Sequence, residues 1–101
     1  MYERAEMVLT KEEIERLTVK VAHNTEKITL DLHGLTVKQA HRLIKNIIAL
    51  DRKSFCIDLV HGYSHGTAIK DMITDFCNPR VLGKSRPDYN PGITKMLISA
   101  A

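Results

Sequence analysis

The stretch Leu30-Asp31-Leu32-His33-Gly34-Leu35 indicates both the fold class and the place where function is to be sought. Asp31 and His33 are two residues apart, so in an extended chain their side chains leave the same face, while the leucines leave the other. The glycine predicts a turn after the strand, and Thr36 then opens a helical pattern. A carboxylate and an imidazole are therefore expected at the carboxyl end of a strand, beside a helix amino terminus. Open α/β sheets bind ligands at such edges.

Strand and helix patterns alternate around this stretch. Residues 27–32 alternate apolar and polar side chains, as a half-buried strand does. Thr36 and Gln39 form a capping box that starts a helix running through Leu50, with an apolar stripe along one side. The near-continuous apolar run at 55–60 is typical of a strand covered on both faces.

The rest of the chain continues the alternation. Helical spacing from Ala68 to Phe76 ends at Asn78-Pro79, residues 80–82 suggest a short strand, and 93–98 form a final strand after a polar loop. We expect a small two-layer α/β sandwich with a βαβαββ core and a mixed, mostly parallel sheet.

The first 26 residues are interpreted as a helical extension packed on the domain formed by residues 27–101. Thr10 and Glu13 form a second capping box, followed by Ile14 and Leu17 on one face. Val21 continues this apolar face, so a short helix covering the core is predicted here.

Charge is unevenly distributed along the 101 residues, a length that fits one domain. Residues 1–35 hold five Lys/Arg and seven Asp/Glu, whereas residues 36–101 hold ten and five. The basic excess after the Asp-His strand suits a polyanionic partner, although solvated lysines are the commoner cause of such an excess.

Cys56 and Cys77 each lie in an apolar run, which predicts buried free thiols in a reducing compartment rather than a disulfide or a metal pair. The start of the chain lacks the pattern of a signal peptide, and no apolar run approaches the length of a membrane span. We expect a cytoplasmic protein with no membrane partner.

A second histidine and glycine follow the strand at 55–60. If the two strands are parallel neighbours, His33-Gly34 and His61-Gly62 meet on one edge of the sheet. Two helix amino termini would point there and favour an anion such as phosphate. Gly62 and Gly66 would allow the backbone to approach that phosphate closely.

These motifs resemble those of the Smr (small MutS-related) domain family over roughly residues 28–98. The Leu-Asp-Leu-His-Gly motif at 30–34 matches in full, while Ser64 stands where many Smr domains have the second glycine of His-Gly-x-Gly. The resemblance implies a fold similar to the carboxyl-terminal domain of a bacterial translation initiation factor. It also implies a role on nucleic acid, as an endonuclease or by binding alone.

The resemblance implies that Asp31 and His33 are an active-site pair. His33 and His61 are the candidate proton donors and acceptors, because imidazole titrates near pH ~6.5, and Asp31 would orient a histidine or accept a proton. RNA is favoured over DNA because a neighbouring 2′-hydroxyl can attack without a metal. No cofactor is assigned, and a divalent metal is left open.

The candidate nucleic-acid contacts are turn glycines, the second loop and basic side chains: Gly34, Lys38, Arg42, Gly62, Tyr63, Ser64, His65, Gly66, Lys70, Lys84 and Arg86. Structural alternatives stand beside these roles. Asp31 would cap the following turn, the histidines would bind backbone carbonyls, and each basic side chain would be a solvated charge. A metal site with His65 is a minority alternative. A nucleic-acid-binding module without catalysis and a protein-interaction domain are the alternative functions.

Overall fold

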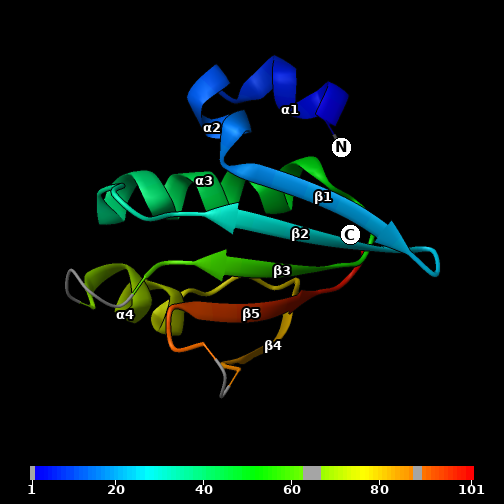
Figure 1. Cartoon of the computed structure of the whole chain (residues 1–101). Coiled ribbons are helices and arrows are strands. Elements are labelled where there is room, and N and C mark those ends of the chain that lie inside the picture. Colours follow the sequence, from blue (N-terminus) through cyan, green and yellow to red (C-terminus); the bar gives the residue numbers. More distant parts are fainter. Residues whose placement is uncertain (1, 63–66, 88–89) are drawn as a thin grey trace.

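The computed structural model describes residues 2–62, 67–87 and 90–101. In this part of the chain, five strands form one sheet in the order β1-β2-β3-β5-β4 (Figure 1). The strands are β1 Leu17–Ala22, β2 Thr25–Asp31, β3 Phe55–Val60, β4 Val81–Ser85 and β5 Ile93–Ile98. The helices are α1 Tyr2–Val8, α2 Lys11–Glu15, α3 Val37–Leu50 and α4 Ala68–Asp75. None of these helices is long and apolar enough to cross a lipid bilayer.

The predicted small α/β fold with a mixed sheet is confirmed, but the pairing is not mostly parallel. Among the described strands, only β2 and β3 pair in parallel, from Glu26 opposite Phe55 to Asp31 opposite Val60. The other three pairings are antiparallel. Antiparallel β5 lies between β3 and β4, although β4 precedes it in the chain. The β2–β3 crossover through α3 thus places the two predicted strand ends side by side.

The prediction of a helix over the amino-terminal apolar residues is wrong beyond Glu15. The capping box of Thr10 and Glu13 is present, but residues 17–22 form β1, paired antiparallel with β2. The hairpin turn at His23 and Asn24 has positive φ at both residues, 53° and 62°, as a two-residue β-hairpin turn of type I′ requires. Residues 17–26 therefore extend the sheet.

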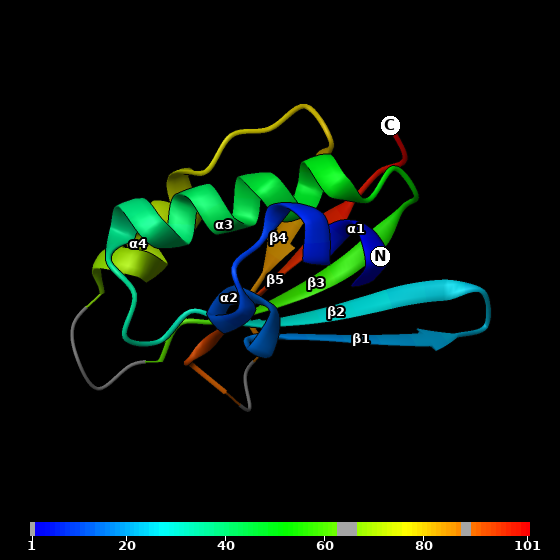
Figure 2. The ribbon, with the colours of Figure 1, turned by 90° about the horizontal axis from the view of Figure 1, so that it is seen from above.

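The core lies between α3, α4 and one face of the sheet (Figure 2). Alternate residues of β2, β3 and β5 point to this face and meet the predicted apolar stripe of α3. The fully buried side chains of the three strands and the helix include Ile28, Leu30, Ile57, Leu59, Met96, Leu43, Ile44 and Ile47. The helix α2 lies at the start of β1, α1 packs against α2 and α3, and Ala5 and Leu9 join the core there (Figure 2).

The other face of the sheet is covered by long side chains. Asp58 of β3 is buried, and its carboxylate makes ion pairs with Lys27 at 3.4 Å and Lys95 at 3.8 Å. The aliphatic parts of lysine side chains can shield a strand in this way while the ammonium groups remain in water. An apolar run such as β3 therefore does not require helices on both faces.

Arg80 joins three segments at the carboxyl end of α3. Its guanidinium donates to the carbonyl oxygens of Ile48, of Lys53 at 3.0 Å and of Ser99 at 2.8 Å, and it lies 6.0 Å from the ring centroid of Phe55.

Replacing this guanidinium should destabilise the domain without changing the other end of the sheet. We expect Arg80→Ala to lower the free energy of unfolding by about 2–4 kcal/mol, because three carbonyl groups lose a donor and two of these hydrogen bonds are partly buried. Urea denaturation measures the change. Lys45→Ala, on the exposed side of α3, is the control and should change the value by less than about 0.5 kcal/mol. Equal effects of both variants would contradict the assigned role.

Candidate functional site

The chain reverses direction directly after β2. The Leu32 N–H donates to the Val60 carbonyl at 2.8 Å, which extends the parallel pairing by one residue. The Leu35 N–H then donates back to the Leu32 carbonyl at 3.2 Å, and Gly34 within this turn has φ of +80°. A type II turn needs a positive φ at this position. We call residues 31–35 the Asp31–His33 turn.

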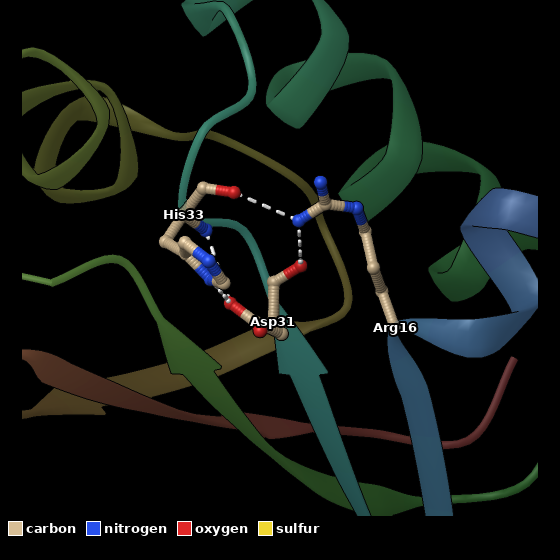
Figure 3. A network of polar contacts seen from close by, with 3 residues as sticks. All are labelled: Arg16, Asp31 and His33. Carbon is tan, nitrogen blue, oxygen red and sulfur yellow. Dashed lines mark hydrogen bonds and ion pairs between the residues drawn. The ribbon is translucent and has the colours of Figure 1, made fainter.

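One carboxylate oxygen organises this turn. Oδ1 of Asp31 accepts a hydrogen bond from the His33 backbone N–H at 3.1 Å and contacts Nδ1 of the His33 ring at 2.5 Å (Figure 3). The same oxygen therefore caps the local backbone, which agrees with the structural alternative for Asp31, and also contacts the imidazole. A carboxylate oxygen only accepts, which assigns the hydrogen to Nδ1. Nε2 of this largely exposed side chain then carries the lone pair when the ring is neutral.

Arg16 lies outside the predicted site residues, and its side chain binds the backbone of the turn. Its Nη1 donates to the carbonyl oxygens of Asp31 at 3.2 Å and His33 at 2.8 Å (Figure 3). These contacts join residues 15 and 17 positions apart. They arise because β1 pairs with β2, and the sequence carried no local signal of that pairing. Arg16 is the functional candidate that the sequence pattern missed.

The amino terminus of α3 follows the turn as predicted. The Thr36 side chain accepts from the Gln39 N–H, and Gln39 Oε1 accepts from the Thr36 N–H. Lys38 is exposed in the first helical turn, and Arg42 makes an ion pair with Glu13 of α2 at 3.7 Å. A helix amino terminus with nearby cations favours an anion.

The second predicted histidine has a different environment. His61 is buried, its Nδ1 lies 2.8 Å from the Gly62 carbonyl, and its Nε2 lies 2.9 Å from the Thr94 hydroxyl. His61 follows β3 on the face of Leu59, whereas Asp31 is opposite Val60 and on the other face. The structure therefore brings Asp31 and His33 together and places His61 against β5.

The His61-Gly62 backbone also binds the residue that precedes β5. Both N–H groups donate to the Gly92 carbonyl, at 2.9 and 3.1 Å. The predicted contacts Tyr63, Ser64, His65 and Gly66 lie outside the described residues.

Three further predicted basic contacts lie on or against α4. Lys70 belongs to α4, where its carbonyl accepts from the Thr74 hydroxyl. Lys84 Nζ donates to the carbonyls of Thr74 and Phe76, at 2.8 and 2.6 Å, and so caps the end of the helix. Arg86 donates to the Thr74 hydroxyl at 2.6 Å. Lys84 and Arg86 therefore have defined structural partners.

A pocket of about 850 Å³ lies at the opposite end of the sheet, where β2 and β3 begin. Glu26 and Asp51 line it, and Asp51 is buried as the residue that ends α3. Burial raises the pKa of Glu26, and the neighbouring Asp51 carboxylate raises it further. Among the described residues, Oδ2 of Asp51 has no hydrogen-bond partner.

The cysteines are free thiols in unequal surroundings. Cys56 is half-buried, and burial raises its thiol pKa while Lys95 acts in the opposite direction. Cys77 is exposed, because it follows the end of α4, so the prediction of a second buried thiol is wrong. Within residues 2–62, 67–87 and 90–101, no three His, Cys, Asp or Glu side chains form a group suited to a metal ion.

Comparison with known proteins identifies the fold. No family model matches the chain, and neither does any curated protein. Among solved structures, the chain is similar to the Smr domain of Thermus thermophilus MutS2, with a TM-score of 0.57 and 24% sequence identity over 69% of this chain and 95% of that chain. The resemblance inferred from the motifs is thus confirmed for the fold.

Gly34 offers a test of the turn. An alanine Cβ would meet no atom within 4 Å, so only the positive φ opposes it. Gly34→Ala should lower the free energy of unfolding by about 1–2 kcal/mol in urea denaturation. Gly83→Ala is the matched control, since that site is equally open and its φ is not positive. If Gly83→Ala costs as much, backbone strain at Gly34 is not the cause.

Glu26 predicts a dependence of stability on pH. Because its pKa is raised above 4.5 in the folded state, the native protein retains a proton that the unfolded chain releases. Stability therefore decreases as the pH rises from about 4.5 through the raised pKa. Glu26→Gln should be more stable than the wild type at pH 7, and the difference should diminish below pH 4.5. Urea midpoints across this range measure it, and equal midpoints at pH 7 would refute the prediction.

Proposed function

We propose that the chain binds nucleic acid at the Asp31–His33 turn and cleaves phosphodiester bonds there, with RNA as the favoured substrate. The 2.5 Å contact between Asp31 Oδ1 and His33 Nδ1 carries this proposal, because it orients the ring and directs Nε2 to solvent. The same contact fixes the ring tautomer that leaves Nε2 free to accept a proton.

In the proposed reaction on RNA, Nε2 of His33 removes the proton of a 2′-hydroxyl. The 2′-oxygen forms a bond to the adjacent phosphorus, and the bond from phosphorus to the 5′-oxygen breaks. The leaving 5′-oxygen takes a proton from water, and His33 returns its proton to solvent. The products are a 2′,3′-cyclic phosphate and a 5′-hydroxyl end. RNA is favoured because its own hydroxyl is a nucleophile that an imidazole activates.

His61 has a positioning role in this proposal. The Gly62 carbonyl only accepts, so Nδ1 donates to it, and Nε2 of the neutral ring accepts from the Thr94 hydroxyl. Nε2 then holds the end of β3 against β5, Nδ1 binds the backbone of the next residue, and proton transfer is assigned to His33.

Several features support binding of a polyanion at this place. The capped amino terminus of α3 follows the turn, with Lys38 exposed in its first turn and Arg42 on the next. Residues 36–101 hold twice as many basic as acidic side chains. The fold likeness to the Smr domain of MutS2 agrees with a role on nucleic acid. We place this activity in the cytoplasm, in line with the free cysteines.

The test is a binding and cleavage assay with labelled RNA and DNA of the same sequence. We expect affinity to fall steeply with salt. We also expect His33→Ala and Asp31→Ala to lower the rate of RNA cleavage by at least about 100-fold. His23→Ala, in the exposed β1–β2 hairpin, is the matched control and should cleave like the wild type.

Other results of this assay would favour one of the two alternative functions. Salt-dependent binding with equal residual cleavage by all variants would indicate a binding module without catalysis. Absence of binding at low salt would overturn the proposal and favour a protein-interaction domain. A parallel series with a chelator tests the metal, since undiminished cleavage excludes an obligatory ion.

A further inference from the structure

Arg16 binds the end of β2 with both its backbone and its side chain. It ends α2, where its N–H donates to the Glu13 carbonyl at 3.1 Å. Its own carbonyl accepts from the Asp31 N–H at 2.9 Å, while Nη1 donates to the carbonyls of Asp31 and His33. The α2–β1 junction is thereby attached to both residues that form the proposed catalytic pair.

The contacts use only one of the three guanidinium nitrogens. Figure 3 shows a second terminal nitrogen directed away from the carbonyls of Asp31 and His33. Among the residues that the structure describes, Nε and Nη2 of Arg16 have no hydrogen-bond partner. A guanidinium is planar and rigid, so the two bonds at Nη1 also set the directions of the remaining N–H groups. The half-buried Arg16 therefore presents oriented donors beside the Asp31–His33 turn.

The surroundings favour an anion at these donors. The amino terminus of α3 follows the same turn, and Arg42 of α3 reaches Glu13, one helical turn before Arg16. Arg16 and Arg42, cations from two separate segments, thus both contact Glu13. A planar guanidinium suits a phosphate because it donates two parallel hydrogen bonds to it.

We propose that Arg16 completes the nucleic-acid site, as the positioning residue of the Asp31–His33 turn and as the ligand of one phosphate of the bound strand. This inference rests on the proposed function. Nη1 holds the turn, and the remaining N–H groups bind the phosphate. Lysine cannot replace both contributions, because its ammonium is a point charge without a rigid fork.

The experiment compares Arg16→Ala and Arg16→Lys with the wild type on a single-stranded RNA. Arg16→Ala should bind about 10-fold more weakly and lose about 0.7 from the slope of log affinity against log salt, the contribution of one phosphate contact. Arg16→Lys should keep most of the slope but cleave more slowly at saturating RNA, since the turn is no longer held. Arg52→Ala removes the same charge at the opposite end of the sheet. It should change neither the salt slope of binding nor the rate of cleavage.

A measurement without RNA separates the positioning role from the phosphate contact. NMR relaxation should show the order parameters of the His33 and Gly34 amides falling from about 0.85 towards 0.6 in both Arg16 variants, while core amides keep wild-type values. Unchanged order parameters overturn the positioning role. If the wild type binds RNA and Arg16→Ala binds with the same slope, the phosphate contact is overturned while the proposed function stands. If the wild type does not bind RNA, the proposed function itself fails.

Discussion

The parallel pairing of β2 and β3 is the constraint on which the rest of the structure depends. A parallel pair needs a crossover, and α3 supplies it while covering the core face of both strands. Because α3 begins directly after β2 and runs back to the start of β3, its amino terminus lies at the edge where β2 and β3 end. The carboxylate and imidazole of the Asp31–His33 turn therefore share that edge with a helix amino terminus, as a consequence of how the core is buried.

The backbone of the turn is held at several points. Asp31 Oδ1 accepts the His33 N–H, the Leu32 carbonyl accepts the Leu35 N–H, and Arg16 donates to the two remaining carbonyls. A short turn fixed in this way orients an exposed imidazole without burying it. Such support is what a catalytic side chain needs from its scaffold, since small displacements reduce catalysis strongly.

The two ends of the sheet have different physical characters. At the start of β2 and β3, polar groups are partly or fully buried and affect stability in opposite directions. The Arg80 hydrogen bonds support the fold, whereas the raised pKa of Glu26 beside Asp51 lowers stability as the pH rises. At the other end, the Asp31 and His33 side chains are partly or largely exposed. Substitutions of the buried polar groups at the first end are expected to act mainly on unfolding, whereas substitutions of the exposed Asp31 and His33 side chains are expected to act mainly on the proposed function.

Local signals in the sequence determined the strand at 27–32, both capping boxes, the stripe of α3 and the Asp-His pair, because capping and period-two or helical spacing involve residues close in the chain. The motif at 30–34 also indicated the fold that the comparison with a solved structure confirmed. Tertiary structure alone decided which strands pair. It made residues 17–22 an edge strand, inserted β5 between β3 and β4, turned His61 to the core face and brought Arg16 to the turn. These outcomes depend on contacts between distant residues, and their energies are set by which surfaces the whole chain can bury together.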